Sequence, residues 1–223
     1  MGAFKLAPSI LSADFANLGK AVQDAEIGGA DYIHVDVMDG RFVPNITFGS
    51  QMVRALRAKT NLPLDLHLMI MEPENHVSEF AKAGADSITI HAEACSDISN
   101  TVDKIKNAGV NAGVAISPDT TFSAIEHIVT QLDLILVMSV YPGFPGQTFI
   151  PQSLNKLSEI RKHLDAERLM AELEVDGGIN KDTISSVVEA GATIVVAGSA
   201  VFNEHETVKE AIDKLRSRLN DNN

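Results

Sequence analysis

Short apolar segments alternate with amphipathic segments along the chain. Most of the apolar segments are continuous, which is typical of parallel strands covered on both faces. They predict strands over Leu6–Ile10, Tyr32–Val37, Leu64–Met69, Ser87–His91, Ala112–Ile116, Leu134–Ser139, Glu172–Asp176 and Thr193–Ala197. The amphipathic segments predict helices that include Asn17–Ile27, Gln51–Lys59, Glu74–Ala83, Ile98–Asn107, Pro151–Leu164 and Lys181–Glu189.

A weak internal repeat supports a single architecture for the whole chain. Glycines at 29, 84, 109 and 191 each stand just before a predicted strand, where a left-handed helix end favours glycine. Eight strand–helix units without a linker predict one (β/α)8 TIM barrel over residues 1–223, near the usual length of ~250 residues. An open doubly wound sheet is the alternative, but no G-x-G-x-x-G motif follows the first strand.

Polar residues stand at the predicted strand ends, where the active site of a TIM barrel lies. His34 and Asp36 are two positions apart, so their side chains share one face of the strand. His67 lies near the end of the third strand and Asp176 ends the seventh. Two imidazoles and two carboxylates can surround one divalent cation such as Zn²⁺, Fe²⁺, Mn²⁺ or Co²⁺. A hydrogen-bonded polar cluster is the alternative, but four such residues at three strand ends favour a metal site.

Two glycine-containing loops follow the last two strands. Gly177-Gly178 and Gly198-Ser199 allow the backbone to approach a ligand closely. The loops after strands seven and eight of a TIM barrel commonly bind phosphate, with a short helix supplying N–H groups. The pair therefore favours a phosphate site over two simple turns.

The segment after the sixth strand contains two prolines and two glycines within residues 142–146, which prevents regular structure. We interpret it as a lid over the substrate, with a plain surface loop as the alternative.

Met38, Met69 and Met138 stand near strand ends and could line a cavity, although buried methionine often fills a core. His91 ends the fourth strand near Glu93 and could support a metal ligand or simply form an ordinary hydrogen bond.

Charge and composition limit the function classes. The chain has 18 basic and 30 acidic residues, with a net charge of −12 and no basic stripe, so we expect no nucleic-acid partner. No apolar run reaches the roughly 18 residues of a membrane span, and the N-terminus does not resemble a secretory signal. We therefore expect a cytoplasmic protein without a membrane partner. A single cysteine, Cys95, excludes a disulfide framework.

Five segments, in order, resemble the ribulose-phosphate 3-epimerase family: residues 7–15, 34–45, 66–69, 175–179 and 197–200. The resemblance implies a TIM barrel of the ribulose-phosphate-binding type. It also implies an isomerase of the pentose phosphate pathway that interconverts D-ribulose 5-phosphate and D-xylulose 5-phosphate. Tyr141 and Pro145 depart from the Asn and Gly that the family usually has in the lid.

The resemblance implies roles for individual residues. One divalent metal per chain would be bound by His34, Asp36, His67 and Asp176, with Zn²⁺ or Fe²⁺ as the first candidates and Mn²⁺ or Co²⁺ also compatible. Asp36 and Asp176 would be the catalytic acid/base pair. Substrate contacts are implied for Ser9, His67, Gly143, Phe144, Pro145, Gly146, Asp176, Gly177, Gly178, Gly198 and Ser199. We also expect a small phosphosugar substrate and a homo-oligomer.

The chemistry of epimerisation agrees with two inward carboxylates. A proton leaves one face of the carbon and returns to the opposite face, so two groups on opposite sides are the simplest arrangement. An epimerase for a related phosphosugar, such as D-allulose 6-phosphate, and a metal-dependent decarboxylase are alternatives. A non-catalytic phosphosugar-binding protein is a third, but it would not need two inward aspartates around a metal.

Overall fold

Eight parallel strands form one sheet in the computed structural model, which describes residues 4–220. The strands are β1 (Lys5–Pro8), β2 (Ile33–Met38), β3 (Leu64–Met69), β4 (Ser87–His91), β5 (Asn111–Ile116), β6 (Leu134–Met138), β7 (Glu172–Asp176) and β8 (Ile194–Ala197). Their order is β1-β8-β7-β6-β5-β4-β3-β2, and a parallel bridge between Ser9 and His34 joins the two edges. The sheet therefore closes into the predicted barrel and is not an open doubly wound sheet.

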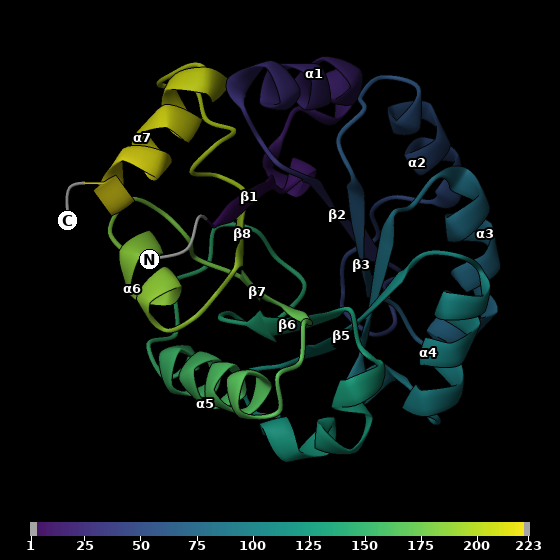
Figure 1. Cartoon of the computed structure of the whole chain (residues 1–223). Coiled ribbons are helices and arrows are strands. Elements are labelled where there is room, and N and C mark those ends of the chain that lie inside the picture. The colour runs from purple at the N-terminus through teal and green to yellow at the C-terminus, as the bar shows by residue number, and fades with distance from the viewer. Residues whose placement is uncertain (1–3, 221–223) are drawn as a thin grey trace.

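Helices surround the strands (Figure 1). Within residues 4–220 the α-helices are α1 (Leu18–Gly28), α2 (Ser50–Arg57), α3 (Val77–Ala83), α4 (Ile98–Asn107), α5 (Ser153–Ala166), α6 (Ile184–Glu189) and α7 (Val208–Asn220). Helix α7, drawn in yellow, lies between α6 and α1 in Figure 1, so the chain's last helix completes the outer ring. Across the described part of the chain, no helix is both long enough and apolar enough to cross a bilayer.

Two segments differ from the sequence-based expectation, one between β5 and β6 and one after β8. The β5–β6 connection contains two short 3₁₀ helices, Phe122–Ala124 and Glu126–Gln131, in place of an α-helix. Its many Thr, Ile and Val residues have weak helix propensity. Helix α7 was not among the predicted helices, although buried Ala211, Ile212 and Leu215 give it an apolar stripe.

The first strand also ends earlier than predicted. It stops at Pro8, and Ile10–Ser12 form a 3₁₀ turn. The Ser9 hydroxyl oxygen accepts a hydrogen bond from the Leu11 N–H (3.3 Å) and so caps this turn. Ser9 therefore follows the carboxyl end of β1, where it pairs with His34.

Alternation along the strands separates two packed regions. Outward-facing residues such as Val35, Leu66 and Ile88 are fully buried against the surrounding helices. A second apolar cluster fills part of the barrel interior and consists of Ala7, Ala115, Leu134, Leu136, Met138, Val140, Ile194 and Val196. Strands β2, β3, β4 and β7 contribute the polar side chains of the interior, which is where the candidate site lies.

Candidate active site

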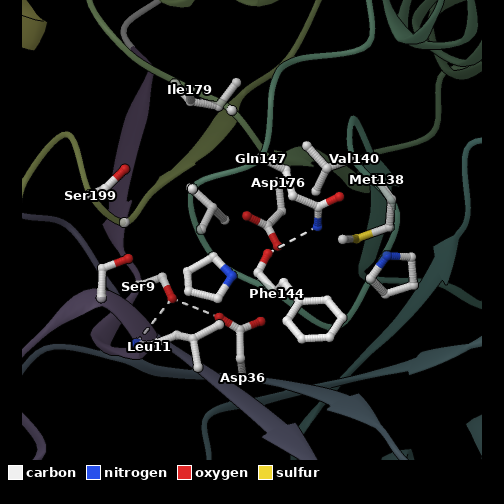
Figure 2. A pocket seen from close by; sticks show the side chains of 18 of the residues that line it. Ser9, Leu11, Asp36, Met138, Val140, Phe144, Gln147, Asp176, Ile179 and Ser199 are labelled. Carbon is white, nitrogen blue, oxygen red and sulfur yellow. Dashed lines mark hydrogen bonds between the residues drawn. The ribbon is translucent and has the colours of Figure 1, made fainter. Parts of the chain in front are cut away.

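A cavity of about 360 Å³ opens at the carboxyl ends of the strands. Ser9, Asp36, Asp176 and Ser199 line it together with the lid, and Figure 2 shows the two aspartates directed into the same space. The three methionines predicted to line a cavity, Met38, Met69 and Met138, all contribute to its wall. Within residues 4–220, no lysine or arginine is among those that line it.

The four residues predicted as metal ligands converge, and two of them, Asp36 and Asp176, line this cavity. One ligand atom each from His34, Asp36, His67 and Asp176 lies within 4.8 Å of the other three. Strand register produces this arrangement, because Asp36 on β2 pairs with His67 on β3, and His34 lies two residues before Asp36 on the same face. The two histidines are completely buried, whereas the side chain of Asp176 keeps 19% of its surface exposed.

Carboxylates lie on both sides of His34. Its Nδ1 lies 2.7 Å from Asp65 Oδ2, and its Nε2 lies 3.4 Å from Asp36 Oδ1. Burial alone would lower the pKa of His34, but the charge of Asp36 and the hydrogen bond with Asp65 raise it well above the usual value. Asp65 is further fixed by a hydrogen bond from the Ser87 hydroxyl (2.5 Å).

His67 has a different environment. Its Nδ1 lies 3.0 Å from Asp36 Oδ1, and its Nε2 lies 2.8 Å from the Nε2 of a second buried histidine, His91. Burial lowers the pKa of His67 to about 4, and the neighbouring His91 adds to this effect. His67 is therefore neutral near pH 7, the form in which imidazole binds metals.

The two aspartates that face the cavity have opposite pKa shifts. Burial would raise the pKa of Asp36, but His34 and His67 lower it below its ordinary range. The Ser9 hydroxyl also donates a hydrogen bond to Asp36 Oδ2 (2.6 Å). Burial raises the pKa of Asp176 to about 7, and the negative charge of Asp36 contributes. The cavity thus contains one ionised carboxylate and one carboxyl group that can hold a proton at neutral pH.

The donor set fits a divalent cation. The completely buried His34 Nε2 has no hydrogen-bond partner, although it faces the cluster. An orphaned imidazole nitrogen beside two carboxylates and a second imidazole is a suitable ligand set for Zn²⁺ or Fe²⁺. His34, Asp65 and Glu174 form a second group of close ligand atoms. In that group, however, Asp65 already contacts His34 Nδ1. We therefore interpret it as support for the first ligand set and not as a second metal site.

The loops after β7 and β8 line the cavity and contain backbone N–H groups without a hydrogen-bond acceptor within residues 4–220. The amides of residues 177–179 and 198–200 have no acceptor among the described residues. Gly177 and Gly178 have φ values of 122° and 66°, and a Cβ on Gly178 would lie 2.5 Å from the Phe149 nitrogen. The expected short helix after Gly198 is absent, because residues 199–201 form turns. Turn amides, rather than helix N-termini, would therefore bind an anion here.

The predicted lid, residues 141–147, is irregular and is attached to the barrel at several points. The Tyr141 hydroxyl donates to Asp119 (3.0 Å), and the Asn45 side-chain amide donates to the Gly143 carbonyl (2.6 Å). Gln147 Nε2 donates to the carbonyl oxygens of Tyr141 (2.6 Å) and Phe144 (2.9 Å). The predicted lid therefore contacts both the loop after β2 and the loop after β5, and it lines the same cavity as the two aspartates.

Sequence reasoning missed several buried polar residues around the site. Asp65 and Glu174 each lie two residues before a proposed ligand, so strand alternation alone could have found them. Glu174 is completely buried and neither carboxylate oxygen has a hydrogen-bond partner. Burial and the charge of Asp65 raise the pKa of Glu174 well above the usual value.

Cys95 lies apart from the cavity, and burial raises the pKa of its thiol to about 12, which agrees with an unreactive cysteine.

Comparison with known proteins identifies relatives of this chain. The model of the ribulose-phosphate 3-epimerase family matches residues 5–202. The ribulose-phosphate 3-epimerase of Bacillus subtilis (strain 168) is 53% identical over 213 residues, which cover 95% of this chain and 98% of that protein. The ribulose-phosphate 3-epimerase of Escherichia coli (strain K12) is 44% identical over 220 residues, covering 98% of this chain and 97% of that protein.

A solved structure supports the fold at much lower identity. The crystal structure of KGPDC from Streptococcus mutans superposes with a TM-score of 0.74 at 14% sequence identity and covers 99% of both chains. This likeness concerns the barrel architecture alone. The family match and the two sequence relatives go further, because they span almost the whole chain at high identity. The chain belongs to the ribulose-phosphate 3-epimerase family.

Proposed function

We propose that this protein interconverts D-ribulose 5-phosphate and D-xylulose 5-phosphate by moving the proton at C3. The observation that carries the proposal is the pair of cavity aspartates with opposite protonation, Asp36 on β2 and Asp176 on β7. The family relationship supplies the substrate, since the relatives are named for this epimerisation. The free N–H groups of the two glycine loops provide a place for its phosphate group.

Proton transfer is the task of the two aspartates. In one direction the ionised aspartate takes the C3 proton, and the protonated aspartate delivers a proton to the opposite face of the same carbon. In the reverse direction the two exchange roles, so one must be protonated and the other ionised in each resting form. The intermediate is an enediolate. The Ser9 hydroxyl, 2.6 Å from Asp36 Oδ2, orients that carboxylate toward the substrate.

The ligand set would hold a divalent metal through His34, Asp36, His67 and Asp176, with Zn²⁺ or Fe²⁺ the first candidates. When bound, the cation would supply a Lewis acid that stabilises negative charge on the substrate oxygens. The buried histidines then act only as ligands, which leaves proton transfer to the carboxylates. The lid and the wall of Met38, Met69 and Met138 exclude water from the reacting carbon.

A substrate panel tests the proposal. We expect kcat/KM for D-ribulose 5-phosphate to exceed that for D-allulose 6-phosphate, and we expect no decarboxylase activity toward phosphorylated keto acids. Removal of divalent metal should abolish turnover, and Zn²⁺, Mn²⁺ or Co²⁺ should restore it. A higher kcat/KM for the hexulose phosphate, or full turnover in protein shown to be metal-free, would contradict the proposal.

A further inference from the structure

A line of hydrogen bonds leads from the metal-ligand cluster to the rim of the barrel. His67 Nε2 lies 2.8 Å from His91 Nε2, and His91 Nδ1 lies 3.0 Å from Glu93 Oε2. Both histidines are completely buried, whereas the Glu93 side chain keeps 28% of its surface exposed. The mechanism described above uses neither His91 nor Glu93.

With a metal bound beside Asp36, the contacts of Glu93 fix the direction of this line. The Glu93 carboxylate can only accept, and its other oxygen, Oε1, already accepts from the Ser117 N–H (2.8 Å) and the Thr120 hydroxyl. His91 must therefore carry its proton on Nδ1 and leave Nε2 as an acceptor. The short contact between the two Nε2 atoms then requires His67 to donate from its Nε2. In a neutral His67, Nδ1 is left without a proton.

That unprotonated nitrogen is the one that faces the cluster. His67 Nδ1 lies 3.0 Å from Asp36 Oδ1 and 4.0 Å from Asp176 Oδ2. We propose that Glu93 and His91 are positioning residues that hold His67 in its Nε2–H tautomer, so that its Nδ1 lone pair points at the metal. This inference rests on the proposed metal-binding function and deepens it.

His34 receives the corresponding support in a different way. Asp65 contacts its Nδ1 directly at 2.7 Å, which directs the other nitrogen, Nε2, toward the cluster. The two ligands thus use opposite ring nitrogens, and a carboxylate orients each of them, directly for His34 and through His91 for His67. The packing of Phe42 against His91, with ring centroids 4.7 Å apart, keeps the intermediate histidine in place.

Glu93→Gln reverses the hydrogen-bonding direction with almost no change in shape. Because Ser117 and Thr120 both donate to Oε1, the glutamine carbonyl oxygen should keep that position, and its NH₂ group should face His91. His91 would then carry its proton on Nε2, and His67 would carry its proton on Nδ1, where it opposes metal binding. Thr120→Val is the matched control, because it removes a donor to Glu93 and leaves the acceptor facing His91 intact.

The experiment combines two measurements on the full-length protein. Long-range ¹H–¹⁵N NMR of the Zn²⁺-loaded protein should show the Nε2–H tautomer for His67 and the Nδ1–H tautomer for His91. Zn²⁺ affinity, measured by competition with a chelating indicator, should fall by about 10- to 100-fold in Glu93→Gln, as expected for loss of an outer partner. In Thr120→Val it should stay within about twofold of wild type, as for ordinary surface changes.

Each result decides the inference. An Nδ1–H tautomer for His67 in the wild type, unchanged Zn²⁺ affinity in Glu93→Gln, or an equal loss in both variants would overturn it. The NMR result does not depend on catalysis, so it separates this inference from the proposed function. A wild type with the expected tautomers but no epimerase activity would contradict only the proposed function.

Discussion

Asp36 and Asp176 face the same cavity, but their strand neighbours are different. In the sheet register Asp36 lies beside His67, whereas Asp176 lies between Met138 on β6 and Val196 on β8. Imidazoles lower the pKa of Asp36, and burial beside apolar side chains raises the pKa of Asp176 to about 7. The comparison shows how one residue type can supply both the base and the acid, because cross-strand neighbours set the protonation state.

The same division extends through the barrel interior. Strands β2, β3 and β4 contribute His34, Asp65, His67, Thr89 and His91, all of which are buried. Strands β1, β5, β6 and β8 contribute the apolar cluster that includes Leu136 and Val196. Strand β7 carries Glu174 and Asp176 between two apolar strands. The polar strands should therefore control chemistry and metal binding, whereas the apolar strands should control stability.

The largest expected effect comes from the two aspartates. Asp36→Asn and Asp176→Asn should each lower kcat by more than the ~10²–10⁴ of a general acid–base group, because a metal ligand is lost as well. In metal-free protein Asp176→Asn should raise the free energy of unfolding near neutral pH, because the raised pKa of Asp176 means that the folded state disfavours its charge. Asp36→Asn should be destabilising, because it removes the negative charge that stabilises the protonated form of the buried His34. Steady-state kinetics and urea unfolding check both, and near-normal turnover in either variant would remove that aspartate from the mechanism.

A substitution on an apolar strand should lower the free energy of unfolding and leave catalysis unchanged. Leu136 is completely buried on β6 and does not line the cavity. Leu136→Ala should lower the free energy of unfolding by about 2–5 kcal/mol, as large-to-small core changes do. Its KM and kcat at a temperature where the protein stays folded should match those of the wild type. A large loss of kcat with unchanged stability would break the proposed division between the strands.

The glycine loop after β7 should affect substrate binding. A Cβ on Gly178 would approach the Phe149 backbone, and φ is +66°, so Gly178→Ala should displace the free amides. We expect KM for the phosphosugar to rise about 100-fold, which corresponds to about 2.7 kcal/mol. Gly109→Ala is the control for backbone strain, because φ is +82° there and no atom lies within 4 Å of the added Cβ. Equal effects of the two variants on KM would contradict a phosphate site at this loop.

The smallest effect is expected in the lid. Pro145 lowers the entropy that the loop loses on closing, but it also lacks one N–H that could contact the substrate. Each effect is about 1 kcal/mol and they oppose each other. Pro145→Gly should therefore change kcat/KM for D-ribulose 5-phosphate by about tenfold or less. An increase of several decades would instead indicate that another phosphosugar is the natural substrate.

The sequence predicted the barrel and the convergence of the four ligands because both depend on strand alternation. His34 and Asp36 share a face by their spacing, and closure of the barrel brings them toward Asp176. Asp65 and Glu174 followed the same alternation but were not recognised, since they lie one layer below the strand ends. Spacing suggested His91, near Glu93, as a partner of a metal ligand, and the structure shows its contacts with His67 and Glu93. Which ligand it contacts could not be derived from spacing, because that depends on side-chain rotamers. The free amides after β7 and β8 likewise depend on loop geometry that glycine permits but does not fix.

Deuterium transfer during turnover tests the central claim most directly. With D-ribulose 5-phosphate in D₂O, a base on one face and an acid on the other predict D-xylulose 5-phosphate with one deuterium at C3 from the first turnovers. The delivered proton then comes from an aspartate that has exchanged with solvent, and NMR or mass spectrometry of the product detects it. D-xylulose 5-phosphate that retains the original C3 proton would contradict transfer by two aspartates on opposite faces.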